Sequence, residues 1–261
     1  ILAAESFRGS FDKSLLEISH IISLEPLLQT LKTAGIDENL EQVLAIYGTG
    51  FRQVYRKADT LNLKHHQSEK YLMNLYQLQL DPDMYRISFH VRSLDDRSLG
   101  WSIMDKDIEN YFKGGFKISD LQVASFIEPS DLSSEFVKNG LLVIPNPTAR
   151  FSRDKPLYLY FELYNLLMNA AGRVHIKIEY TLTSTEARKK KTLFNLFGLL
   201  GKAKTASISI QNEHRYDQEF ATEYLALDVS SLPAGSYMLS VKVEDDTGGV
   251  LAEKSKRVQL Q

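Results

Sequence analysis

The sequence predicts an all-β protein that folds as two β-sandwiches in tandem, and three observations carry this prediction. The chain has 13 Tyr and 13 Phe among many Val, Ile and Leu, a composition typical of pleated, half-buried strands. These residues fall in short runs of period two, and one run recurs later in the chain with its flanking turn. A length of 261 residues suits two domains of average size.

The clearest strand covers residues 157–164 (LYLYFELY). Leucines and Phe161 alternate there with tyrosines and Glu162, which predicts a strand with one buried face. Residues 174–182 repeat the alternation. We expect further strands at residues 14–22, 40–47, 50–56, 85–92, 205–210, 224–229, 237–243 and 254–260.

One short helix interrupts the first half of the chain. Ser23 is a suitable N-cap, and Gly35 can end the helix in a left-handed conformation. Its apolar stripe consists of Leu24, Leu27, Leu28 and Leu31. Residues 64–78 fit either a strand or a helical turn that leads into one.

An internal repeat defines the architecture. Residues 80–85 (LDPDMY) precede the strand RISFHV, and residues 232–237 (LPAGSY) precede MLSVKV, at a constant offset of 152 positions. A turn that delivers a Tyr to the start of a long strand is the sequence form of a tyrosine corner. Two immunoglobulin-like or fibronectin-III-like sandwiches explain the repeat better than one large barrel, which would not use the same corner twice.

The domain boundary is expected where Gly114 and Gly115 interrupt the strand pattern. This divides the chain into a first sandwich at residues 1–113 and a second at residues 114–261. The second sandwich contains a basic and apolar insertion at about residues 186–204.

Four segments form a distinctive set: residues 136–147 (FVKNGLLVIPNP), 156–166 (PLYLYFELYNL), 193–198 and the closing strand pair after residue 232. Together they resemble the β-rich region of bacterial GWxTD-domain proteins, with a weaker match at residues 15–26. The name-giving signature is absent, because Trp101 stands in Gly-Trp-Ser-Ile-Met. The resemblance implies an extracytoplasmic bacterial protein, in the periplasm or on the cell surface. It implies no catalytic residues, and no signal peptide is visible in the sequence.

Composition excludes several classes of function. The formal charge of −2 and a pI near 6.4 give no basic excess for nucleic acid. The absence of cysteine excludes disulfides, thiolate metal sites and a cysteine nucleophile.

No nucleophile elbow, phosphate loop or His-Glu-x-x-His motif occurs, so we expect a protein that is not an enzyme and needs no cofactor or metal. The pair His65 and His66 suits chelation poorly, and the paired aspartates in turns suit turn chemistry better than calcium.

Two features are candidate partner-binding sites. The first is the outer face of residues 157–164, where Tyr158, Tyr160 and Tyr164 would form an aromatic row suited to protein or glycan. The alternative is that a neighbouring segment, residues 125–154, covers this row.

The second feature is an apolar stretch between two basic clusters. Its apolar members are Leu193, Phe194, Phe197, Leu199 and Leu200, and its basic members are Arg188, Lys189, Lys190, Lys191, Lys202 and Lys204. It is too short to span a bilayer. The sequence leaves three alternatives open: a loop that covers one end of the sandwich, an element that docks in a partner's groove, and a peripheral contact with an anionic membrane.

The sequence therefore predicts a non-catalytic binding or scaffold subunit of a bacterial envelope or cell-surface assembly, with other protein subunits as partners. Two alternatives remain at this stage. One is a carbohydrate-binding module that uses the tyrosine row, and the other is a pair of accessory domains from a larger enzyme.

Overall fold

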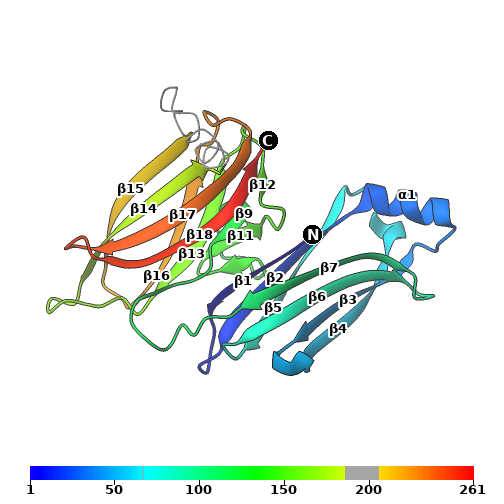
Figure 1. Cartoon of the computed structure of the whole chain (residues 1–261), viewed down its shortest axis with the longest axis horizontal. Coiled ribbons are helices and arrows are strands. Elements are labelled where there is room, and N and C mark those ends of the chain that lie inside the picture. The colour runs from blue at the N-terminus through cyan, green and yellow to red at the C-terminus, as the bar shows by residue number, and fades with distance from the viewer. Residues whose placement is uncertain (67, 186–205) are drawn as a thin grey trace, which may run out of the picture. The chain divides into compact units, whose positions relative to one another are not determined.

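The computed structural model describes residues 1–66, 68–185 and 206–261. The chain forms two compact units, Ile1–Asn110 and Tyr111–Gln261. Each unit is a β-sandwich, which confirms the predicted tandem arrangement (Figure 1). The predicted boundary followed residue 113, and the structural boundary follows residue 110.

The first unit contains two sheets that face each other across one hydrophobic core. A three-stranded sheet has the order β1-β2-β5, a four-stranded sheet has the order β4-β3-β6-β7, and both contribute to the core. The strands are β1 (Leu2–Arg8), β2 (Ser14–Ser23), β3 (Asn39–Tyr47), β4 (Gln53–Asn62), β5 (Tyr71–Leu80), β6 (Met84–Ser93) and β7 (Ser98–Asp107).

The predicted helix is present as α1 (Leu24–Ala34), at one end of the first unit (Figure 1). Gly35 ends it with a φ of 63°, a left-handed conformation that glycine adopts without steric cost. Ser23 occupies the N-cap position but makes no side-chain capping hydrogen bond. The ambiguous segment 64–78 is a short 3-10 helix (Leu63–His66) followed by β5. The strand expected at residues 50–56 begins at Gln53, because residues 49–51 form a 3-10 turn.

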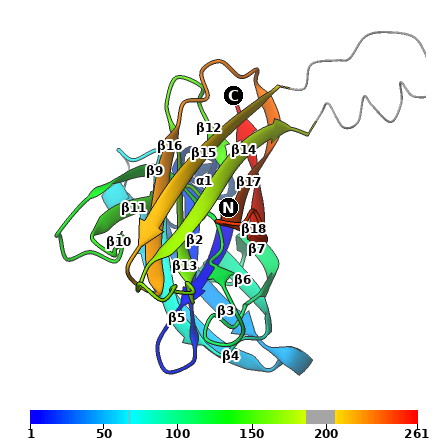
Figure 2. The same cartoon turned by 90° about the vertical axis from the view of Figure 1, so that its left-hand side faces the viewer.

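The second unit is larger and adds strands to the same plan. One sheet has the order β10-β11-β9-β13-β16 with β8 also paired to β13, and the other has the order β12-β18-β17-β14-β15 (Figure 2). The strands are β8 (Lys117–Ile118), β9 (Gln122–Pro129), β10 (Val137–Lys138), β11 (Leu141–Pro145), β12 (Arg150–Phe151), β13 (Leu157–Tyr164), β14 (Val174–Ser184), β15 (Ser207–Tyr216), β16 (Phe220–Leu227), β17 (Gly235–Asp245) and β18 (Val250–Leu260).

The two units repeat one strand order. The order β1-β2-β5 matches β9-β13-β16, and the order β4-β3-β6-β7 matches β15-β14-β17-β18. Even a β-bulge is repeated, because an extra residue opposite β6 falls at Leu99 and its counterpart opposite β17 falls at Leu251. These positions keep the 152-residue offset found in the sequence.

Both predicted tyrosine corners are formed. The hydroxyl of Tyr85 donates to the carbonyl oxygen of Asp81 at 2.9 Å, and that of Tyr237 donates to the carbonyl oxygen of Pro233 at 2.8 Å. Each ring is buried at the start of the long inner strand. The bond ties the incoming turn to the sheet in both units.

Candidate functional site

The tyrosine row of β13 does not form the exposed surface expected from sequence. Tyr158 is half-buried, whereas Tyr160 and Tyr164 are fully buried. The hydroxyl of Tyr160 donates to Glu162 at 2.5 Å, and the side-chain amide of Asn139 donates to both groups at 2.8 Å. Asn139 belongs to residues 125–154, the segment named as a cover for the row.

Tyr164 belongs to the same buried layer. The hydroxyl of Tyr164 donates to the second carboxylate oxygen of Glu162, and its ring packs on Tyr111 and Phe220. The Lys138 ammonium lies 4.5 Å from the centroid of the Tyr160 ring. Burial, followed by the nearby Glu162 charge, raises the pKa of Tyr160 well above its ordinary value. The expectation that Tyr160 and Tyr164 are exposed to a partner is therefore wrong.

The second predicted feature lies outside the described residues. This applies to the apolar residues Leu193, Phe194, Phe197, Leu199 and Leu200, and to the basic residues Arg188, Lys189, Lys190, Lys191, Lys202 and Lys204. The covering loop, the docking element and the membrane contact therefore all remain predictions for this segment.

The second unit holds another buried polar cluster between β15 and β16. The hydroxyl of Tyr216 donates to Glu223, and the Nδ1 atom of His214 lies 3.5 Å from the same carboxylate oxygen. Burial raises the pKa of Glu223. The Glu223 carboxylate therefore has two neighbouring polar side chains, whereas the Nε2 atom of His214 is buried without a hydrogen-bond partner.

The structure reveals a candidate site that sequence reasoning did not select, the outer face of the four-stranded sheet in the first unit. Trp101 and Ile103 lie two residues apart on edge strand β7 and are 68% and 49% exposed. Register places His90 beside Trp101 and Ser88 beside Ile103 on β6. We call these four residues the Trp101 face.

A bidentate ion pair borders one end of the Trp101 face. The Arg86 guanidinium donates to both carboxylate oxygens of Asp105, at 2.7 and 2.9 Å. This pairing holds the pKa of Asp105 below its ordinary value. The exposed Phe51 ring lies 5.5 Å from the same guanidinium and extends the apolar surface.

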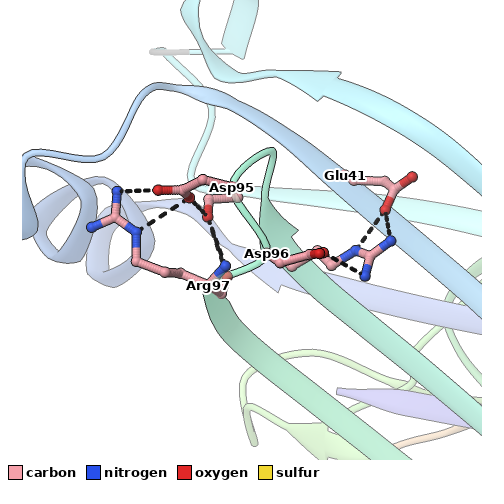
Figure 3. Close-up of polar contacts among 6 residues, drawn as sticks. Glu41, Asp95, Asp96 and Arg97 are labelled. Atoms are coloured by element: carbon pink, nitrogen blue, oxygen red, sulfur yellow. Dashed lines mark hydrogen bonds and ion pairs between the residues drawn. The ribbon is translucent and has the colours of Figure 1, made fainter.

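A second charged cluster borders the other end, at the β6–β7 hairpin (Figure 3). Arg92 donates to Glu41 on β3 at 2.6 Å and lies 2.7 Å from Asp96. Arg97 pairs with Asp95 at 2.9 Å in the same hairpin. Each arginine of this cluster has a carboxylate partner, and the three carboxylates outnumber the two arginines by one. The Trp101 face therefore lies between an Arg86–Asp105 ion pair at one end and a hairpin cluster of slight negative charge at the other.

The Trp101 face presents two large apolar side chains beside one histidine and one serine. Within residues 1–66, 68–185 and 206–261, no three His, Asp or Glu side chains gather as metal ligands. In the same described ranges, no helix is long and apolar enough to span a membrane. The sequence analysis considered Trp101 only for the missing GWxTD signature and did not select it as a binding residue. The missed signal is the alternation of Trp101 and Ile103 with Ser102 and Met104 along a strand.

Comparisons with known proteins assign no family. No protein-family model matches the chain, and no curated protein matches it. Among solved structures, a tetra-tandem repeat from the extending region of a large adhesion protein aligns with all of this chain and 48% of its own. The sequence identity is 10% and the TM-score 0.27. This chain therefore spans about half the length of that structure.

Two other solved structures give similar values. A DUF3823 family protein from Bacteroides ovatus has 12% identity and a TM-score of 0.27, over 87% of this chain and 91% of that one. A β-glucuronidase from Bacteroides uniformis has 9% identity and a TM-score of 0.28, over 94% of this chain and 26% of that one. These TM-scores are low, and no functional argument rests on them.

Proposed function

We propose that this chain is a non-catalytic binding or scaffold subunit that contacts another protein through the Trp101 face. The observation that supports the proposal is the pair of large apolar side chains, Trp101 and Ile103, exposed side by side on a regular sheet. Trp is enriched among the residues that dominate protein interfaces. A rigid strand presents both side chains at little conformational cost.

The charged borders of the face fit the same role. Arg86, Arg92 and Arg97 each have a carboxylate partner within this unit. A partner that covers Trp101 and Ile103 therefore does not need to supply carboxylates for these arginines. The ion pairs would lie at the polar rim of the interface. Placement of the assembly in the bacterial envelope rests on the resemblance to GWxTD-domain proteins and belongs to the proposal.

The carbohydrate-binding alternative is not supported, because the aromatic surface that it requires is not exposed. It depended on an exposed row at Tyr158, Tyr160 and Tyr164, and the last two are buried and bonded to Glu162. The alternative of accessory domains from a larger enzyme keeps the same binding surface and differs only in the partner.

A comparative affinity purification tests the proposal. The tagged chain is incubated with detergent-solubilised source cells, and the retained proteins are quantified by mass spectrometry. A double variant, Trp101→Ser with Ile103→Ser, is compared with Tyr224→Ser, which alters a residue 48% exposed on the second unit. We expect a stoichiometric partner that the double variant loses and Tyr224→Ser retains. The same retained set for all three proteins would contradict the proposal.

A further inference from the structure

Strand β5 lies at one edge of the three-stranded sheet in the first unit, separated from β1 by β2. It pairs with β2 along its whole length, from Tyr71 opposite Ser23 to Leu80 opposite Ser14. Helix α1 also lies against it, but no described strand pairs with its other side. The backbone N–H and C=O groups on the free side of an edge strand can pair with a further strand. β5 therefore offers an edge of ten residues for strand addition.

β5 differs from the other edge strands in its charge. Its sequence, YLMNLYQLQL, contains no Asp, Glu, Lys, Arg or Pro. In the part of the chain that the structure describes, the other strands at the ends of the sheets are β1, β4, β7, β10, β12, β15 and β16, and each carries a charged residue. Charges and prolines on edge strands discourage pairing with other chains, and β5 has neither.

The second unit carries an acidic side chain at the corresponding edge. β16 has the place of β5 in the repeated strand order, and Glu223 on β16 lies opposite the core residue Phe161. A charged residue that points inward on an edge strand is one of the devices that prevent pairing. At the matching place in the first unit, Asn74 lies opposite the buried residue His20 and carries no charge. The two units therefore differ at this edge although their strand order is the same.

The apolar side chains of β5 are only partly buried. Four of them pack against the core of the first unit without being fully covered: Leu72, Tyr76, Leu78 and Leu80. On the opposite face of the strand, Tyr71 is 59% exposed. A strand added at this edge would cover apolar surface on both faces of the sheet, and such burial favours association.

We propose that β5 pairs with β5 of a second copy of this chain, antiparallel and about a twofold axis perpendicular to the sheet. A charge near the centre of a self-paired strand lies close to its own copy and repels it. β5 carries no charge over its full length, so it meets this condition for self-pairing. The three-stranded sheets of the two copies join into one continuous sheet, in a dimer of the commonest symmetry. The proposal is independent of the Trp101 face, which belongs to the other sheet of the unit.

The two faces of β5 determine the register of this pair. Residues opposite each other in an antiparallel pair point to the same side of the sheet. A centre at Leu75 places Leu72 opposite Leu78 of the second copy, beside the core. It also places Asn74 opposite Tyr76, so that two polar groups meet. The next register that keeps the faces, centred on Tyr76, places Asn74 opposite Leu78 and is less favourable.

Single cysteines test the pairing and its register, because the chain has no cysteine of its own. Leu75→Cys places two sulfur atoms at the axis, where opposite Cα atoms lie about 4.5–5.5 Å apart and a disulfide can form. Tyr71→Cys lies on the same face of the strand, but its two copies are about 27 Å apart. We expect mild oxidation of the full chain to give a covalent dimer with Leu75→Cys and a monomer with Tyr71→Cys. Random collision would favour Tyr71→Cys, since Tyr71 is the more exposed residue.

Two charge variants at exposed positions test the same register without a cross-link. Tyr71 lies opposite Gln79 of the second copy, and both side chains are exposed. The variant Tyr71→Lys with Gln79→Lys brings like charges together, whereas Tyr71→Lys with Gln79→Glu brings opposite charges together. We expect sedimentation of the full chain to give a dimer dissociation constant at least about tenfold higher for the first variant than for the second. Val54→Lys on edge strand β4, at a residue 37% exposed, should leave the dimer unchanged.

Three results would overturn the proposal. The first is a wild-type chain that sediments as a monomer at concentrations up to about 0.3 mM. The second is equal cross-linking of Leu75→Cys and Tyr71→Cys, and the third is equal dissociation constants for the two charge variants. The double variant Trp101→Ser with Ile103→Ser should dimerise like the wild-type chain. If that variant loses its protein partner while no dimer is found for the wild-type chain, the dimer is disproved and the proposed function remains.

Discussion

The two units share a strand order and a bulge position but treat the same sheet edge in opposite ways. In the second unit, β18 carries Glu253, Lys254 and Lys256 within residues 250–256 and is paired at its end with β12. In the first unit, the corresponding edge strand β7 is uncharged over residues 98–104. The comparison shows that the two units keep one strand order although the charges on this edge strand differ.

The interiors differ as well, and this difference has the largest expected effect. His20 follows Leu16 and Ile18 on the inner face of β2, where the second unit continues with Phe161 on β13. His20 is fully buried, with its ring centroid 4.0 Å from that of Phe89. Burial lowers the pKa of His20 from 6.5 to about 4.

The first unit should therefore lose stability in mild acid. Between pH 6.5 and about 4, the unfolded chain binds a proton at His20 that the folded chain does not. The free energy of unfolding falls as the pH falls through this window, by about 3 kcal/mol in total. His20→Phe, which copies the second unit, should remove this part of the pH dependence in urea titrations at about pH 7 and about pH 4.

An exposed histidine provides the control for this prediction. His90→Gln on the Trp101 face should keep the full acid-dependent loss, since His90 is exposed on the same unit. An unchanged pH dependence in His20→Phe would show that carboxylates, and not His20, account for the acid sensitivity.

The tyrosine corners should give a smaller effect that is equal in the two units. Tyr85→Phe and Tyr237→Phe each remove one hydroxyl that bonds to a turn carbonyl while they keep the buried ring. Loss of such a bond costs about 1 kcal/mol. Denaturant midpoints should shift alike for both variants, and Tyr224→Phe, at an exposed position, should leave the midpoint unchanged. A lower denaturant midpoint for only one of the two variants would show that the two hydrogen bonds, although alike in geometry, contribute differently to stability.

Much of the fold could be predicted from local patterns. Period-two alternation in residues 157–164 located a strand, and Ser23 and Gly35 marked the ends of α1. The 152-residue repeat located both tyrosine corners. The strand, the helix ends and each separate corner depend on residues close in sequence, and the repeat is found by comparing the sequence with itself.

The candidate site depended on contacts distant in sequence, and prediction failed there. Alternation shows that Tyr160 and Leu159 face opposite sides, but it does not show whether Asn139 covers the tyrosine side. Trp101 was dismissed because residues 100–104 lacked a known signature, although its strand lies at a sheet edge with an exposed face. Strand pairing across the whole unit determines which strand lies at a sheet edge. A local sequence pattern therefore cannot predict it.

The smallest expected effect concerns the closed edge of the second unit. Lys254→Ser removes the ion pair with Asp120, whose side chains are 28% and 19% exposed. Ion pairs near the surface contribute up to about 1 kcal/mol, so the denaturant midpoint should fall slightly at low salt and less at high salt. Lys254→Met keeps the aliphatic stem and separates packing from charge. A loss above about 2 kcal/mol would show that Lys254 contributes more to stability than an ordinary surface ion pair does.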